Sequence, residues 1–281
     1  MHLTCAGDER LTNLKASAAP WCPAGLLIPF VACPQGRSAA KMRRMPVPKT
    51  PPPAVTVPIR VWDLPTRLFH WLLAAAVLGS VVSAKIGGNA MEWHFRFGFL
   101  VMGLLAFRLL WGFLGGRWSR FASFIYAPAT LWRYLRGGSG AEEHHDVGHN
   151  PLASLSVFAL LAVLAVQLGT GLLADDEIAN IGPLNRFVST DTGLAATAWH
   201  KEYGQWLVLG LVALHVLAIA WYFWRRRVNL LGPMLGGDKL LPPGTPASAD
   251  ALRQRLLAAV LAAVCGVGVW QVVLLGRAEF A

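Results

Sequence analysis

The sequence predicts an all-α integral membrane protein, with a transmembrane bundle of four core helices and a fifth, C-terminal helix. Hydrophobic residues make up 55% of its 281 residues, whereas Asp, Glu, Lys and Arg make up only 14%, against roughly 25% in soluble proteins. The apolar residues are gathered in long runs that contain almost no charge. Because neither a soluble enzyme nor a disordered chain has such runs, both classes are disfavoured.

Five apolar runs are long enough to cross a lipid bilayer, for which a helix needs about 20 mostly apolar residues. They cover residues 68–84, 95–114, 152–174, 199–224 and 256–275. The second run contains Arg108, so this helix is not expected to face lipid on all sides. Each run is predicted to be a membrane-spanning helix, and the bilayer is the first expected partner.

Lys and Arg are distributed unequally between the two sides of these helices. One side carries twelve of them near the helix ends, whereas the other carries five beside the acidic run 175–177. Cytoplasmic loops of membrane proteins are rich in Lys and Arg, so the sequence predicts a multi-pass protein of the bacterial cytoplasmic (inner) membrane with a cytoplasmic N-terminus. The net charge of +10 forms no continuous basic face, so nucleic acid is not an expected partner.

The N-terminal region differs in composition from the rest. Residues 46–58 contain six prolines, which is typical of an extended linker. Residues 1–60 are therefore predicted to be a disordered, proline-rich tail, and translation is expected to begin at Met42 or Met45. None of the four cysteines belongs to a Cys-x-x-Cys-His motif, so covalent attachment of haem is excluded.

Four of the eight histidines lie within or at the ends of the predicted helices. His70 is near the cytoplasmic start of the first helix and His94 is at the outer start of the second. His200 is at the outer start of the fourth helix, and His215 follows fifteen residues later, which is about 22 Å of helical rise. His215 should therefore lie at the depth of His70, and His200 at the depth of His94.

Paired imidazoles inside a helix bundle point to haem ligation. Ionisable side chains are costly in a bilayer and usually functional, and two neutral imidazoles can ligate one haem iron axially. Two non-covalent haem b groups are therefore predicted. Two alternatives stay open: histidines that only pack in the bundle, and a zinc or iron transporter. A transporter would usually bring its histidines to one site with carboxylates.

Five segments resemble the bacterial cytochrome b561 and nickel–iron hydrogenase cytochrome b subunit family. They are RVWDLPTRLFHW (60–71), EWHFRFGF (92–99), FRLLWGFLG (107–115), GHNPLASL (148–155) and WHKEYGQWLVLGLVALH (199–215). The resemblance implies a dihaem membrane cytochrome whose ligand positions fall on His70, His94, His200 and His215. It also implies partners for electron transfer: a quinone pool, and a periplasmic dehydrogenase, a hydrogenase or a c-type cytochrome.

Other polar residues have weaker claims to a role. Arg108 is expected near the depth of the inner haem, where it could pair with a propionate, or could extend to the cytoplasmic interface instead. Arg67 and Arg96 flank ligand positions and are expected mainly as interfacial anchors. His149 is expected to cap the third helix together with its neighbours, with an inner quinone pocket as the alternative.

The predicted function is electron transfer across or into the membrane through two bis-His haems, between an outer-face redox partner and the quinone pool. Residues 61–240 would form the four-helix dihaem domain, and residues 241–281 a linker and the fifth helix. An electron-transfer subunit is favoured over a stand-alone quinone-linked or superoxide-linked oxidoreductase. A non-redox membrane anchor for a periplasmic enzyme is the remaining alternative.

Overall fold

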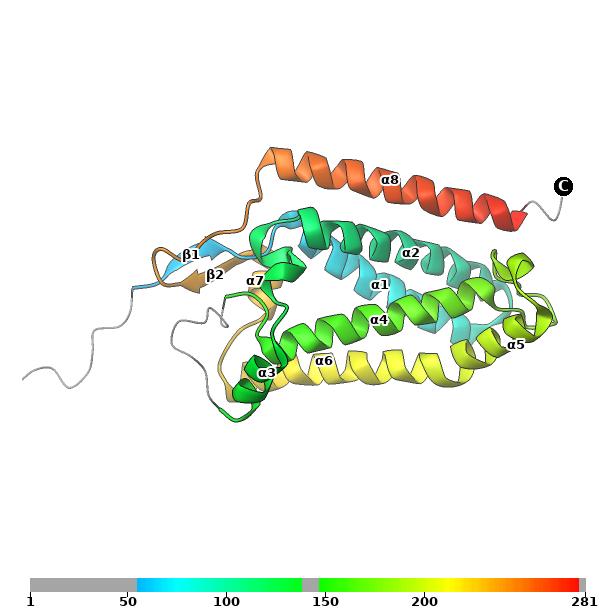
Figure 1. Ribbon diagram of the computed structural model, residues 1–281, viewed down its shortest axis with the longest axis horizontal. Coiled ribbons are helices and arrows are strands. Elements are labelled where there is room, and N and C mark those ends of the chain that lie inside the picture. The colour runs from blue at the N-terminus through cyan, green and yellow to red at the C-terminus, as the bar shows by residue number, and fades with distance from the viewer. Residues whose placement is uncertain (1–54, 138–146, 278–281) are drawn as a thin grey trace, which may run out of the picture. The chain divides into compact units, whose positions relative to one another are not determined.

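The computed structural model describes residues 55–137 and 147–277. Residues 1–54 of the predicted tail, including Met42 and Met45, lie outside this part of the chain. Within it, five helical segments are long and apolar enough to cross a membrane. These are Leu64–Ile86, Gly88–Leu114, Pro151–Leu173, Thr190–Arg225 and Leu252–Gly276. The predicted all-α transmembrane architecture is confirmed, and Figure 1 shows the helices running alongside one another.

Polar caps determine where two of these helices begin. Helix α1 (Leu64–Ile86) starts four residues before the predicted run, because the Asp63 side chain accepts a hydrogen bond from the Thr66 N–H at 2.8 Å. Helix α4 (Pro151–Leu173) starts in the same way, with the Asn150 side chain accepting from the Ala153 N–H at 2.8 Å. Both helices also have proline in the first turn, where its missing N–H costs no hydrogen bond.

Helix α2 (Met91–Leu114) follows α1 after a one-turn 3₁₀ helix, Gly88–Ala90, and packs closely against it. The fifth spanning helix, α8 (Leu252–Arg277), packs mainly on α2. Buried side chains from the three helices form a common apolar core. They are Phe69, Phe107, Trp111, Ala258 and Cys265. The thiol of Cys265 is therefore part of the packing between helices.

The fourth spanning segment is longer than predicted. It consists of α5 (Thr190–Ala198), a π-helical turn at Trp199–Gly204 and α6 (Gln205–Arg225). The prediction began at Trp199 because the polar residues of α5 hide its continuity with the apolar run. A π-helical turn is rare and is frequently found at functional sites.

A two-stranded antiparallel ribbon lies at one end of the bundle, which we call the ribbon end. Strand β1 (Val57–Arg60) pairs with β2 (Asp238–Leu241), so the last four residues of the predicted disordered tail are ordered. Ile59 and Leu241 pack in a small core with Trp118. Proline content alone suggested a linker, whereas pairing with a segment far along the chain orders these residues.

A buried polar network also lies at the ribbon end. Asp63 is fully buried and accepts hydrogen bonds from Ser119 Oγ at 2.6 Å and from Trp111 Nε1 at 3.1 Å. Thr66 Oγ1 donates to Ser119 Oγ at 2.7 Å. Because a buried carboxylate is stable only when its oxygens are hydrogen-bonded, this network holds the start of α1 against the end of α2. Two short helices, α3 (Pro128–Leu135) and α7 (Leu231–Gly236), complete this end.

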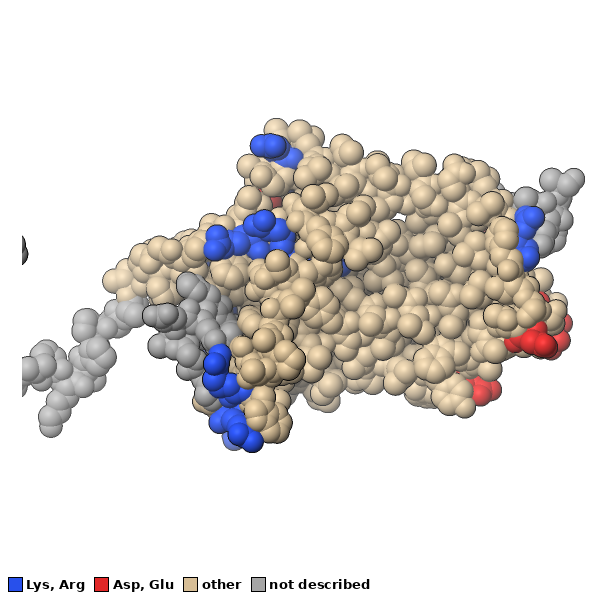
Figure 2. Space-filling view, viewed as in Figure 1, with Lys and Arg blue, Asp and Glu red and all other residues tan. Residues whose placement is uncertain are grey.

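Charged side chains are distributed unequally along the bundle. On the face seen in Figure 2, most Lys and Arg gather at the ribbon end, whereas most Asp and Glu, with a smaller group of Lys or Arg, lie at the opposite end, beside α5. We call the latter the α5 end. The Asp176 carboxylate accepts from the backbone of residues 178–180 in the loop after α4. Partial burial opposes ionisation there, but hydrogen bonds from Asn180 and its neighbours hold the pKa of Asp176 well below its usual value.

Candidate functional site: two pairs of facing histidines

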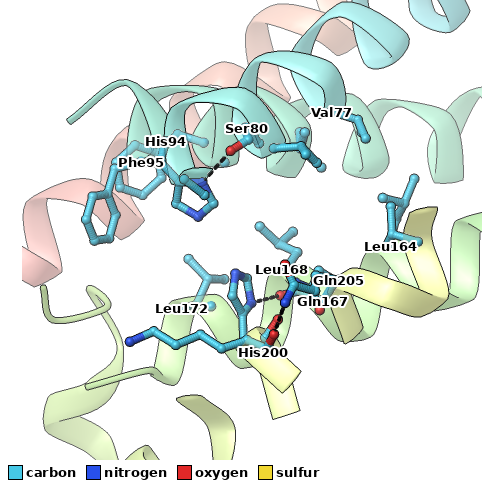
Figure 3. Close-up of a pocket in the computed structure, with 18 of the residues that line it drawn as sticks. Val77, Ser80, His94, Phe95, Leu164, Gln167, Leu168, Leu172, His200 and Gln205 are labelled. Carbon is cyan, nitrogen blue, oxygen red and sulfur yellow. Dashed lines mark hydrogen bonds between the residues drawn. The ribbon is translucent and has the colours of Figure 1, made fainter. Parts of the chain in front are cut away.

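His94 and His200 face each other at the α5 end. His94 is in the first turn of α2 and His200 is in the π-helical turn. Their ring centroids are 5.9 Å apart and their ring planes are perpendicular, at 90°. In Figure 3 the two rings point toward the same space from opposite sides. This is one of the two pairs that helical depth predicts.

Backbone carbonyls determine which nitrogen of each ring is free. Nδ1 of His94 lies 2.9 Å from the Ser80 carbonyl oxygen, and Nδ1 of His200 lies 2.8 Å from that of Gln167. Because a carbonyl oxygen can only accept, each Nδ1 carries the proton and each Nε2 keeps its lone pair. This is the arrangement of a metal-ligating histidine, in which the second nitrogen is held by a hydrogen bond.

His70 and His215 form the second pair, nearer the ribbon end. His70 belongs to α1 and His215 to α6, and their ring centroids are 6.3 Å apart with an interplanar angle of 51°. Nδ1 of His70 is buried and has no hydrogen-bond partner among the described residues. The structure therefore brings all four histidines together in the predicted pairs, while their role as iron ligands stays a prediction.

Both separations fit an iron atom between two imidazoles. An Fe–N bond of about 2 Å on each side, with about 1 Å more to each ring centre, puts the two centroids about 6 Å apart. A direct hydrogen bond between two rings would instead bring two nitrogen atoms to within about 3 Å, and none is found between the members of either pair. The residues present therefore fit bis-His haem.

A cavity of about 350 Å³ surrounds the His94–His200 pair. Its walls come from α1, α2, α4 and the π-helical turn and are mostly apolar, with Val77, Phe95 and Leu168 among the lining residues. Gly98 lines the cavity and has open space where a Cβ would be. A cavity of this size and composition is typical of a cofactor site.

Gln167 holds His200 in two ways, and the sequence analysis did not identify it. The backbone carbonyl of Gln167 accepts from the His200 ring, and the side-chain Nε2 of Gln167 donates to the His200 carbonyl oxygen at 3.0 Å. Gly204 makes room for this amide, because a Cβ at Gly204 would overlap Gln167 Oε1. A glutamine inside an otherwise apolar run was the available signal, since a buried amide needs partners.

Arg108 is buried and reaches the turn that follows α2. Only 4% of its surface is exposed, its Nη1 donates to the Ser119 carbonyl oxygen at 2.9 Å, and its guanidinium lies 4.8 Å from the Phe121 ring centre. A backbone carbonyl of the turn that follows α2 and an aromatic ring therefore hold the guanidinium near the end of this helix. Its interfacial position stays a prediction. Its pairing with a haem propionate stays a prediction.

The expected cap at His149 is made by its neighbour, Asn150. The His149 ring instead packs between Trp62 and Phe124, with ring centroids 4.7 and 4.5 Å away. Burial, with a contribution from the positive charge of Arg108, lowers the pKa of His149 to about 3. His149 is therefore neutral at physiological pH and holds the start of α4 against the ribbon end.

The two other arginines have protein partners at the surface. Arg67 donates to the Leu235 carbonyl oxygen, and Arg96 forms an ion pair with Glu92 one helical turn away. Their role as anchors near the helix ends stays a prediction.

Comparisons with known proteins agree with this architecture. The family model for prokaryotic cytochrome b561 matches residues 61–237. A probable Ni/Fe-hydrogenase B-type cytochrome subunit of Azotobacter chroococcum is 27% identical, over 67% of this chain and 91% of its own. The probable Ni/Fe-hydrogenase 1 B-type cytochrome subunit of Escherichia coli K12 is 24% identical, over 56% and 80%.

No solved structure matches the chain significantly. The family match covers more than half of the sequence and includes all four paired histidines. With five helices long and apolar enough to span a bilayer, the chain is a multi-pass membrane protein that belongs to the prokaryotic cytochrome b561 family.

Proposed function

We propose that the chain holds two haem b groups, one between His94 and His200 and one between His70 and His215, and transfers electrons through the membrane. The observation that carries this proposal is the separation of both ring pairs by about the distance that bis-His ligation requires. Each haem, when bound, supplies a one-electron carrier. The side chains of the protein bind and orient each haem.

The protein contributes ligation, orientation and exclusion of other chemistry. Each histidine pair would supply two donors to its iron, which would leave no position for oxygen or a substrate and would suit electron transfer. The carbonyls of Ser80 and Gln167 hold the rings of His94 and His200 and increase their basicity. These features favour an electron-transfer subunit over an oxidoreductase with its own substrate site.

A hydrogenase is the outer-face partner that we propose first. The relatives described above are named as cytochrome subunits of Ni/Fe-hydrogenases, and the chain resembles them over most of their length. A periplasmic dehydrogenase or a c-type cytochrome is the alternative partner, and the quinone pool is the proposed partner within the membrane.

The charge distribution supports an orientation with the ribbon end in the cytoplasm. A topology reporter fused after Arg227, at the end of α6, is then expected to report the cytoplasm. A reporter fused after Asp191, in α5, is expected to report the outer compartment. Alkaline phosphatase and fluorescent protein fused at each point report whether that point faces the outer compartment or the cytoplasm. The opposite pattern would contradict the proposed orientation of the bundle in the membrane.

Haem content tests the proposal most directly. Purified full-length protein is expected to contain two non-covalent haem b groups per chain by the pyridine haemochrome assay, and both should be redox-active in reduced-minus-oxidised spectra. A preparation without redox-active haem would favour the non-redox membrane anchor. Turnover with quinol in the absence of any partner would favour the stand-alone oxidoreductase.

A further inference from the structure

Two lysines line the same cavity as the His94–His200 pair. Lys85 is in the last turn of α1, and Lys201 directly follows His200 in the π-helical turn. Both are exposed and lie at the α5 end, whereas Val101 and Leu164 line the cavity from within the helical spans. The cavity thus combines apolar walls with two cations near one end of the bundle.

None of the described residues that line the cavity is a carboxylate that could balance these charges. Among the described residues that line it there are two lysines and two histidines but no Asp or Glu. Lys85 Nζ donates to the neutral amide oxygen of Gln205 at 2.9 Å and lies 5.5 Å from the Trp206 ring centre. The nearby Glu92 forms an ion pair with Arg96, so it does not neutralise Lys85 or Lys201.

This distribution specifies the chemistry of the ligand. A flat, mostly apolar molecule with carboxylates along one edge would place its body between the histidines and its charges beside the lysines. Haem b has this form, because its two propionates project from the same edge of the macrocycle. Charge-assisted hydrogen bonds from ammonium groups to these carboxylates are among the stronger polar contacts in proteins.

We propose that Lys85 and Lys201 bind the propionate carboxylates of the haem held by His94 and His200. The inference rests on the proposed function, because it requires a haem at this pair. It also sets the direction in which the haem is inserted, with its carboxylate edge toward the α5 end. The lysines then raise the reduction potential of this haem, because a nearby cation favours the form of the iron with less positive charge.

The test measures haem release from detergent-solubilised, haem-loaded full-length protein to excess apomyoglobin. Lys85→Met and Lys201→Met are each expected to accelerate release of one of the two haems about fivefold, as expected for a partly exposed ion pair. Both substitutions should affect the same haem and lower its midpoint potential. Lys85→Arg and Lys201→Arg, which keep the charge, should restore release to nearly the original rate.

Arg96→Met is the matched control, because it removes an exposed cation of the same end that does not line the cavity. It should leave both release rates unchanged. If the lysine variants alter binding to anionic vesicles or electron transfer to a partner, while haem release and potential stay the same, the lysines serve a membrane or docking surface and the inference is overturned. If the original protein holds no haem at all, the proposed function fails as well, so the two failures are distinguishable.

Discussion

Alanine in place of His94 or His200 is expected to remove one haem and to leave the other spectroscopically intact. Each substitution leaves the iron at the α5 end with a single axial donor, and the facing ring cannot be replaced by a histidine about 22 Å away along the helix. His70→Ala and His215→Ala should each remove the other haem. Haem content should therefore fall from two to one per chain in all four variants.

Potentiometric titration of the four variants identifies which redox component each one lacks. His94→Ala and His200→Ala should lack the same component, and His70→Ala and His215→Ala the other. Any of the four should also stop electron transfer across the bilayer, because the remaining haem lies too far from one face. Loss of the same component in His70→Ala and His94→Ala would contradict the pairing.

Gly171→Ala is expected to remove the haem at the α5 end almost as completely as the histidine substitutions do. A Cβ at Gly171 would lie 2.8 Å from Cε1 of the His200 ring, closer than real Cβ atoms approach a neighbour, and 3.1 Å from Nδ1, which is also tight. The ring must therefore move away from the Gln167 carbonyl that holds it at 2.8 Å. If the ring leaves this position, it loses the hydrogen bond from its Nδ1 to Gln167, and its Nε2 no longer points toward His94.

Gly169→Ala is the matched control, because it lies two residues earlier on α4 and has nothing within 4 Å of its added Cβ. The two variants carry the same chemical change in the same helix, so the change in helix propensity is about the same in both. Haem content and the amplitude of each redox component measure the difference. Equal haem content in both variants would show that His200 does not ligate from the position described.

The spanning helices and the depth of each histidine follow from local sequence. An apolar run long enough to cross a bilayer must satisfy its backbone hydrogen bonds internally, so it forms a helix whatever its neighbours do. A helix then converts sequence separation into depth at a constant rise. For this reason, the interval between His200 and His215 was sufficient to predict which histidines face one another.

Local sequence did not give the ribbon or the polar network that surrounds the start of α1. The apolar run omits Leu64–Arg67, but the Asp63 cap is a local signal that begins the helix earlier. The partner that buries Asp63, Ser119, lies 56 residues further along the chain. Strand β1 was included in a proline-rich tail because its partner, β2, lies far along the chain. Apolar length and local caps predict the spans, whereas the ribbon and the buried network depend on contacts between distant residues.

The orientation of the histidine rings and the surroundings of Arg108 depend on tertiary structure alone. Gln167 and His200 are 33 residues apart, yet two hydrogen bonds between them leave Nε2 of His200 free toward His94. Arg108 is held by the Ser119 carbonyl and the Phe121 ring, so its guanidinium is buried against the segment that follows α2. The helical rise sets the depth of a side chain. Its rotamer, tautomer and burial instead depend on neighbouring atoms that only packing brings within a few ångströms. Hydrogen bonds and van der Waals contacts act over no longer distance, so the sequence alone does not determine them.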